Sequence, residues 1–265
     1  MNVIGSGVVR KMRNRLHNPV SYAAKIGKKE IALNPLLGEK VQLNFSGNIF
    51  CINCGRKTKK SFNQGYCYPC FQSLQQWFTC LIHPEKCRCK DGDCMQSHIV
   101  YLANSSGLKV GITRMTQVPT RWIDQGATQA LAIMRVRSRL QSGELEMAFK
   151  QHVADKTNWR EMLKGTASEL DMACERDRLL ADCEEDITQL TERFGFFAIS
   201  ILKGVDPVSI CYPVGSYPEK INSLSFDKEP VVSGILQGIK GQYLILDSGV
   251  INLRRFSGYE VEFKA

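Results

Sequence analysis

The sequence lacks any hydrophobic run long enough to cross a membrane. Its longest apolar stretch, Phe196 to Leu202, covers seven residues, whereas a membrane-spanning helix needs about 20. No apolar run follows Met1 either, which argues against a secretory signal segment. We therefore expect no membrane partner and a cytoplasmic location.

A glycine-rich phosphate-binding loop is also missing. The nearest approximation, Gly234, Gly238 and Gly241, lacks the lysine and hydroxyl residue that end such a loop, and no helical pattern follows it. The sequence therefore predicts no nucleotide cofactor.

The composition otherwise fits a folded protein. With 265 residues, 43% of them hydrophobic, the chain is long enough for one large domain or for two to three small ones. Eleven cysteines in a chain without an export signal favour metal binding in a reducing compartment over a disulfide framework.

Positive charge is concentrated in the first third of the chain. Residues 1–95 carry 15 lysines and arginines against 5 acidic residues, whereas residues 166–194 carry 3 against 9. A basic segment of this kind attracts phosphate backbones, and its binding should weaken strongly with salt. We expect a nucleic-acid partner, DNA or RNA; the alternative is a solvated basic surface that keeps the protein soluble.

Two close cysteine pairs give the clearest local signal. Cys51 and Cys54 form one pair, Cys67 and Cys70 form the other, and twelve residues separate them. Two thiolates three positions apart grip one side of a tetrahedral metal, and two such pairs complete the four-sulfur shell that zinc prefers in structural sites. The pattern predicts a bound Zn²⁺.

The chain between the two pairs is strongly basic. Four cations are predicted to contact nucleic acid there, on a loop that the metal would hold rigid: Arg56, Lys57, Lys59 and Lys60.

A second cysteine cluster suggests a second zinc. The predicted ligands are Cys80, Cys87 and Cys94 with either His83 or Cys89, and His98 is a more distant candidate. The spacing is irregular, so the fourth ligand stays open. The alternative is that some of these thiols are free and that His83, before Pro84, ends a turn.

The organisation along the chain predicts an α+β protein. Its expected parts are a β-rich segment (1–49), a zinc-binding module (50–95), a central α/β core (96–164), one long helix (165–195) and a second β-rich segment (196–265). Alternating strands at 29–33 and 41–45, and a hairpin turn at 247–249, carry the β predictions. We expect the two ends to share one small barrel or sheet, because short strands need partners at their edges. Two independent β units are the alternative.

The long helix is predicted from Thr166 to Gly195. Glu169 lies three residues after Thr166, as in a capping box, and Gly195 is a typical stop. Cys183 falls on the apolar stripe of this helix, so we expect it in the core and not at a metal.

The central segment reads as a hairpin followed by helices. Its strands contain Ile99-Val100-Tyr101 and Lys109-Val110-Gly111, and helical patterns follow around Arg121 and Glu146. Over residues 98–160 this order of motifs resembles the GIY-YIG nuclease family. The resemblance implies catalytic roles for Tyr101, Lys109, Arg121 and Glu146, and a weaker match at Asn158. The chain departs from the motifs at Ile99 and Lys109.

The implied reaction is metal-dependent hydrolysis of a phosphodiester. Mg²⁺ or Mn²⁺ on Glu146, with the Arg121 guanidinium, would stabilise charge on the phosphate oxygens, and Tyr101 would position or deprotonate the attacking water. Lys109 is a second cation, or a proton acceptor if burial lowers its pKa. The alternatives are a catalytically inactive nucleic-acid-binding protein, with Tyr101 simply packed on the sheet, and a zinc-stabilised protein interaction adaptor.

The whole chain also resembles an uncharacterised bacterial family of zinc-cysteine proteins of unknown function. The matching stretches begin at Cys51, Gln64, Lys109, Arg121, Asp155 and Gly238. This resemblance implies no activity.

Overall fold

The computed structural model describes residues 1–77, 80 and 83–265. The chain divides into two compact units. The β unit comprises residues 1–76, 163–165 and 211–265, and the α/β unit comprises residues 77–162 and 166–210. In the described part of the chain, no helix is both long enough and apolar enough to span a membrane.

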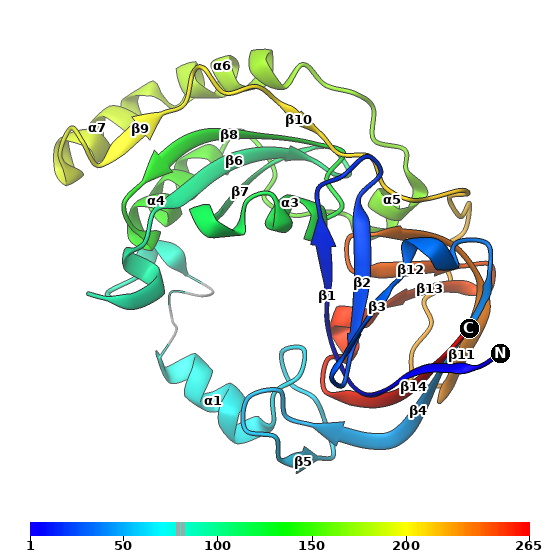
Figure 1. Cartoon of the computed structure of the whole chain (residues 1–265). Coiled ribbons are helices and arrows are strands. Elements are labelled where there is room, and N and C mark those ends of the chain that lie inside the picture. The colour runs from blue at the N-terminus through cyan, green and yellow to red at the C-terminus, as the bar shows by residue number, and fades with distance from the viewer. Residues whose placement is uncertain (78–79, 81–82) are drawn as a thin grey trace. The chain divides into compact units, whose positions relative to one another are not determined.

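One antiparallel sheet forms the body of the β unit (Figure 1). Its strands lie in the order β13, β12, β11, β4, β14, β1, β2 and β3, and β5 pairs with β4. The bounds are β1 (Val3–Arg15), β2 (Ser21–Ile26), β3 (Lys29–Ala32), β4 (Lys40–Phe50), β5 (Lys57–Thr58), β11 (Val231–Lys240), β12 (Tyr243–Leu246), β13 (Gly249–Asn252) and β14 (Tyr259–Lys264); the unit also contains helix α1 (Tyr68–Trp77) and the 3₁₀ turns η1 (Asn34–Leu36) and η5 (Leu253–Phe256).

The two ends of the chain meet in this sheet. β14 lies between β1 and β4, so Val261 is paired with Gly7 on one side and with Phe45 on the other. The prediction that the termini share one sheet is therefore confirmed, and two independent β units do not form. The turn predicted at 247–249 joins β12 to β13, with Leu246 opposite Gly249.

Strand β4 is longer than its sequence pattern suggested. β4 begins near the predicted strand but continues to Phe50, because its later residues pair with β14 and β5. This extension carries the chain directly to Cys51. Buried Val41 and Leu43 alternate along β4, which is the pattern of a strand with one face on a core.

A second antiparallel sheet forms the centre of the α/β unit. Its strands lie in the order β10, β8, β6 and β7, and β9 pairs with β8. The bounds are β6 (His98–Asn104), β7 (Leu108–Arg114), β8 (Gln129–Val136), β9 (Ile199–Ile201) and β10 (Val208–Ser209), with helices α3 (Thr120–Asp124), α4 (Arg139–Phe149), α5 (Trp159–Lys164, which crosses the boundary between the units), α6 (Met172–Asp182) and α7 (Glu184–Phe194) and the 3₁₀ turns η2 (Pro84–Lys86), η3 (Gly92–Met95) and η4 (Met115–Gln117). Helices and antiparallel sheets together make the α+β fold that was predicted.

The central hairpin forms where it was predicted, with β6 and β7 paired from end to end. Val100, Leu102 and Val110 belong to a core cluster to which helices α4, α6 and α7 also contribute. Because side chains alternate along a strand, Tyr101 and Lys109 lie on the opposite face of the hairpin.

The single long helix predicted for 165–195 is wrong. Two helices, α6 and α7, replace it, and they meet at Cys183, whose backbone (φ −108°, ψ 14°) leaves the helical range. Helix α6 begins at Met172 because the Asp171 carboxylate accepts hydrogen bonds from the N–H groups of Ala173 and Cys174. Cys183 is buried in the core, as predicted.

Candidate functional site

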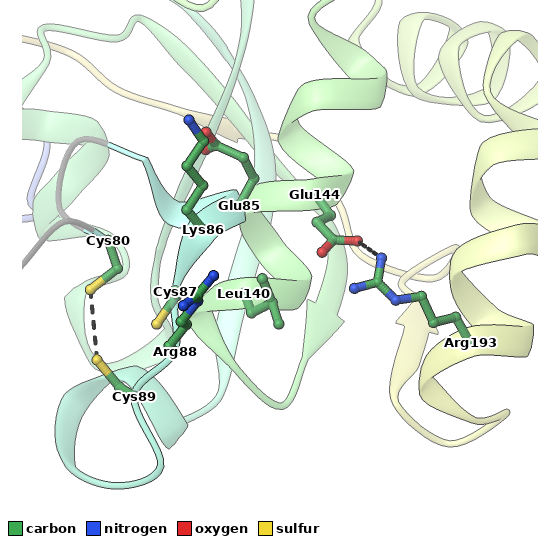
Figure 2. A pocket seen from close by; sticks show the side chains of 9 residues that line it. All are labelled: Cys80, Glu85, Lys86, Cys87, Arg88, Cys89, Leu140, Glu144 and Arg193. Carbon is green, nitrogen blue, oxygen red and sulfur yellow. Dashed lines mark hydrogen bonds and ion pairs between the residues drawn. The ribbon is translucent and has the colours of Figure 1, made fainter.

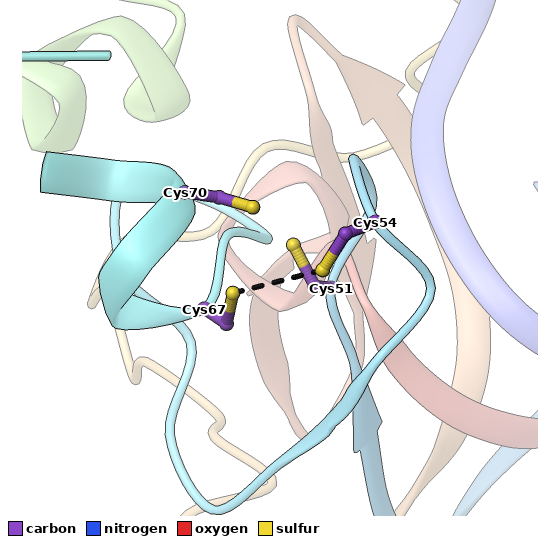
Figure 3. A group of neighbouring side chains, drawn as sticks. All are labelled: Cys51, Cys54, Cys67 and Cys70. Atoms are coloured by element: carbon purple, nitrogen blue, oxygen red, sulfur yellow. Dashed lines mark hydrogen bonds between the residues drawn. The ribbon is translucent and has the colours of Figure 1, made fainter. Parts of the chain in front are cut away.

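Four cysteines converge in the β unit (Figure 3). Cys51 follows β4, Cys54 lies in the next turn, Cys67 precedes α1 and Cys70 is in its first turn. The four Sγ atoms lie within 4.8 Å of one another, and those of Cys54 and Cys67 are 3.8 Å apart. A tetrahedral zinc with Zn–S bonds of about 2.3 Å holds its sulfurs about 3.8 Å apart, so the group fits this ion.

The thiols of this group oppose one another's ionisation. Burial alone would raise the pKa of Cys51, but N–H groups of Cys54, Cys67 and Asn53 directed at its sulfur outweigh burial and lower the pKa to about 6. The Asn53 amide lowers the pKa of Cys70, yet the neighbouring sulfurs raise it to about 11 overall. A divalent cation among the four sulfurs removes this conflict, because it stabilises every thiolate at once.

The four predicted nucleic-acid contacts, Arg56, Lys57, Lys59 and Lys60, are all exposed. Two backbone hydrogen bonds hold their segment beside these four sulfurs, the first sulfur group. The Cys51 N–H donates to the Arg56 carbonyl, and the Gly55 N–H donates to the Cys51 carbonyl. Gly55 adopts φ 73°, which favours glycine. The basic side chains therefore project from a turn that the sulfur group fixes.

A second group of four cysteines lies in the α/β unit. The Sγ atoms of Cys80, Cys87, Cys89 and Cys94 lie within 4.8 Å of one another. The Sγ of Cys80 is 3.8 Å from that of Cys89 and 3.6 Å from that of Cys94, which again matches the edges of a zinc tetrahedron. This group can hold a second zinc.

The fourth sulfur of this group belongs to Cys89, and His83, the other candidate, lies outside the group. The His83 side chain is 51% exposed, and its Nδ1 lies 3.1 Å from Glu85 Oε1. It precedes the 3₁₀ turn η2, which starts at Pro84, so the chain returns to the sulfurs only at Cys87. The other candidate, His98, is buried at the start of β6, where its Nδ1 bonds the carbonyl oxygen of Gln96.

A cavity of about 760 Å³ opens beside the second sulfur group (Figure 2). Cys80, Cys87 and Cys89 line it. Across it, Glu144 of α4 forms an ion pair with Arg193 of α7 at 2.8 Å. Helix α4 holds the group in place, because the Arg139 guanidinium donates to the Cys80 carbonyl.

Tyr101 is buried against the neighbouring strand. Its partner across the hairpin is Gly111, and a Cβ at Gly111 would lie only 2.7 Å from the phenol Cζ and Oη. The Tyr101 hydroxyl donates to Gln125 Oε1 at 2.8 Å, and the ring packs 6.0 Å from that of Trp122. Burial raises the pKa of Tyr101, although the nearby Arg121 opposes this. The phenol therefore stays protonated.

Two of the four predicted catalytic residues, Arg121 and Glu146, lie close enough to affect the ionisation of the other two, Tyr101 and Lys109. The pKa of Tyr101 responds to Arg121 and to Glu146, and that of Lys109 responds to the same two residues. Burial and the Arg121 cation lower the pKa of Lys109 to about 8, while its Nζ donates to the Thr157 hydroxyl. Strands β6 and β7 and helices α3 and α4 thus each contribute one member.

Two further charged residues complete this cluster, and the sequence analysis missed both. Lys150 Nζ lies 3.5 Å from Glu146 Oε2 and 3.1 Å from Asp155 Oδ2. Burial raises the pKa of Glu146, although Lys150 opposes this. The four-residue spacing from Glu146 to Lys150 on one helix was the available signal. Asn158 has a structural role instead: its side chain accepts the N–H groups of Arg160 and Glu161 at the start of α5.

Comparison with known proteins identifies the family. Residues 38–261 match DUF2797, described as a protein of unknown function, and because this match spans most of the sequence, the chain belongs to that family. The comparison does not confirm the resemblance to the GIY-YIG nucleases. No curated protein and no solved structure matches the chain.

Proposed function

We propose that this DUF2797 protein is a zinc-stabilised nucleic-acid-binding protein whose α/β unit hydrolyses phosphodiester bonds with the help of a divalent cation. One observation carries the proposal: Tyr101, Lys109, Arg121 and Glu146 come from four elements, and Arg121 and Glu146 each lie within electrostatic reach of both Tyr101 and Lys109. Clustered groups with shifted pKa values are typical of catalytic sites.

The side chains of the cluster suit separate steps. Lys109 is the proton acceptor, because an amine with a pKa of about 8 is partly neutral near neutral pH. Arg121 pairs with the phosphate and stabilises the charge that develops on its oxygens. Tyr101, which is protonated and held by Gln125, fixes the position of its neighbours.

The cluster also fits a divalent cation. The Lys150 ammonium already lies between the carboxylates of Glu146 and Asp155, which marks a place where positive charge is stabilised. These two carboxylates would hold Mg²⁺ or Mn²⁺, which supplies electrophilic stabilisation of the phosphate.

Binding is assigned to the basic turn at the first sulfur group. Its exposed cations are Arg56, Lys57, Lys59 and Lys60. Reduced sulfur groups need a reducing compartment, which supports the predicted cytoplasmic location. Zinc at both groups is part of the proposal, since each has the sulfur spacing that this ion requires.

A second candidate, binding without cleavage, has one observation in its favour. The Tyr101 side chain is 0% exposed and its hydroxyl is already bonded, so it cannot itself approach an attacking water without rearrangement. In this alternative the cluster only recognises phosphate.

The deciding experiment measures cleavage of labelled DNA and RNA by the zinc-loaded protein in Mg²⁺ and in Mn²⁺. Glu146→Gln removes the half-buried carboxylate with little change in shape, and Glu192→Gln is a matched control on the exposed face of α7. We expect the first variant to lose about 100-fold in rate and the control to keep the wild-type rate. Equal cleavage by all three proteins would indicate a contaminating nuclease, and binding with no cleavage by any of them would leave the second candidate.

A further inference from the structure

A second cavity, of about 340 Å³, lies within the β unit beside the first sulfur group. Three stretches of the chain form its wall: strand β1, η5 with the residue that follows it, and the segment from Ile52 to Tyr66. The lining residues are Arg10, Lys11, Ile52, Asn63, Gln64, Tyr66, Arg254 and Ser257.

Main-chain hydrogen bonds fix the three stretches to one another. The Gly258 N–H donates to the Val9 carbonyl at 2.9 Å, and the Phe50 N–H donates to the Gly258 carbonyl at 2.7 Å. A Cβ at Gly258 would lie 2.6 Å from the Phe50 carbonyl oxygen, so this close approach requires glycine. These bonds tie the residues after η5 to β1 and to the end of β4.

The segment from Ile52 to Tyr66, which starts at the first sulfur group, is hydrogen-bonded to the same wall. The Ile52 N–H donates to the Gly65 carbonyl at 2.8 Å, and Arg10 Nη1 donates to the Ile52 carbonyl at 2.9 Å. Asn63 and Gln64 both adopt left-handed conformations, with φ 43° and 64°. Such strain in two consecutive side-chain-bearing residues is typical of positions where a fold presents groups to a ligand.

The cavity is cationic. Arg10, Lys11 and Arg254 line it, each half-buried, and none of the described residues that line it is acidic. A guanidinium keeps its charge at every physiological pH and matches the geometry of phosphate oxygens. The chemistry of the wall therefore selects an anion, and phosphate above a single carboxylate.

The other lining groups suit a ligand larger than phosphate. The Asn63 and Gln64 amides can donate and accept hydrogen bonds, and Tyr66 offers an aromatic ring. Tyr66 is fixed in place, because its backbone pairs in both directions with that of Phe62, at 2.8 and 2.9 Å. The volume, about 340 Å³, falls in the range of small-ligand sites. Cations, amides and a ring match the phosphate, sugar and base of one nucleotide.

We infer that this cavity binds a single nucleotide unit, with its phosphate on Arg10, Lys11 and Arg254 and its base against Tyr66. The inference rests on the proposed function and deepens it: the nucleotide belongs to a single-stranded nucleic acid, because a paired base stays stacked within its duplex. The nucleic-acid strand continues over the basic turn at 56–60, which follows the cysteine pair Cys51 and Cys54 of the first sulfur group.

The test compares two double variants that remove the same charge. Lys11→Met with Arg254→Met empties the cavity of two cations but leaves Arg10, which bonds the backbone. Arg15→Met with Lys28→Met removes two exposed cations from the same unit and is the control. Both are made with Glu146→Gln and without Mg²⁺ or Mn²⁺, so that cleavage does not interfere. Circular dichroism and zinc content verify folding.

The assay is fluorescence anisotropy with ten-nucleotide single strands of deoxythymidine and of uridine over a range of salt. We expect the cavity variant to bind about tenfold more weakly than the control variant, with a salt slope lower by about 0.7 for the one phosphate lost. Tyr66→Ala should weaken binding by about 5- to 100-fold, whereas Tyr66→Phe should bind like the wild type. A blunt duplex should bind more weakly than either strand.

Three outcomes would overturn the binding of a nucleotide unit in the cavity. These are equal affinities for the cavity and control variants, no effect of Tyr66→Ala, and displacement of the strand by polyglutamate as readily as by unlabelled strand. Competition by uridine monophosphate distinguishes a free nucleotide from one within a nucleic-acid strand. We expect it to displace the labelled strand only at millimolar concentration. Displacement at micromolar concentration would overturn the assignment to a strand.

The experiments distinguish a failure of the proposed hydrolysis from a failure of the cavity assignment. If the wild type binds strands through the cavity but never cuts them, the cavity stands and hydrolysis falls. If Glu146→Gln abolishes cleavage while the cavity variant binds like its control, hydrolysis stands and the cavity assignment falls.

Discussion

Replacing Gly111 by alanine tests how the α/β unit positions Tyr101. The added Cβ would lie 2.7 Å from the phenol Cζ and Oη, whereas carbon atoms in contact lie about 3.5–4.0 Å apart. Tyr101 is fully buried and cannot escape toward solvent. The ring must therefore move by about 1 Å, and the 2.8 Å hydrogen bond to Gln125 must stretch or break.

The expected cost follows from three contributions. Overpacking of this kind costs about 1–3 kcal/mol, and loss of the hydrogen bond adds about 1 kcal/mol. Replacing glycine inside a strand returns about 0.5–1 kcal/mol. The net loss is about 2 kcal/mol, which lowers the melting temperature of a unit of this size by roughly 8 °C. Cleavage should fall as well, because the moved ring displaces the neighbouring Arg121.

Gly204→Ala is the matched control, since nothing lies within 4 Å of a Cβ at that position and its φ is not positive. It should change the melting temperature by less than about 2 °C. Thermal unfolding followed by circular dichroism measures both variants. Combining Gly111→Ala with Tyr101→Leu should cost less than the two changes added together, because the shorter side chain avoids the clash. If Gly111→Ala and Gly204→Ala have the same melting temperature, the packing of Tyr101 on Gly111 is refuted.

Three further predictions concern metal, catalysis and stability. Elemental analysis should find two zinc ions per chain, one after Cys67→Ser or Cys89→Ser, and still two after His83→Ala, because the His83 imidazole lies outside the sulfur group. The cleavage rate should rise about tenfold per pH unit up to about pH 8 and then level off, because neutral Lys109 predominates above that pH. Lys109→Met should lower the rate at least about 100-fold, which is the smallest effect expected on losing a proton acceptor. Lys240 is 0% exposed and burial lowers its pKa from 10.5 to about 8, so between these pH values the unfolded chain keeps a proton that the folded chain has lost. The free energy of unfolding should therefore rise with pH across that window by about 3 kcal/mol, and chemical denaturation of Lys240→Met should show no such rise.

Each of these predictions has an outcome that contradicts it. A zinc content unchanged by Cys89→Ser would indicate that His83 is the fourth ligand of the second group. A pH profile that is flat between pH 6 and 8 would remove Lys109 as the proton acceptor. A parallel rise in the stability of the wild type and Lys240→Met would assign the effect to another group.

Local spacing explains which parts of the metal groups could be predicted. Cys51 and Cys54 are three positions apart, so a single turn brings their sulfurs together whatever the rest of the chain does. The second group has no such regular pair, and the choice between His83 and Cys89 depended on the path of the chain after Pro84. That path follows from packing of η2 against α4, at Gly143, where a Cβ would lie 2.4 Å from the η2 backbone.

The same distinction applies to the fold. The β6–β7 hairpin was predictable because a polar turn separates two alternating runs. The break between α6 and α7 was not, because the apolar stripe continues through Cys183. The cationic cavity was also beyond sequence reasoning: Arg10 and Arg254 lie near opposite ends of the chain, and only the pairing of β1 with β14 brings their segments together.

The ionisation of Tyr101 and Lys109 explains why the lysine is the better proton acceptor on this face of the hairpin. In water a phenol loses its proton before an alkylammonium does, by about half a pKa unit. Burial disfavours whichever form is charged, so it raises the pKa of Tyr101 and lowers that of Lys109 to about 8. The order of the two groups is reversed, and groups whose pKa values are driven apart in this way are typical acid and base partners. Tyr101→Phe should therefore lower the cleavage rate but keep its inflection near pH 8, whereas Lys109→Met should abolish the inflection; the opposite result would make the phenol the proton acceptor.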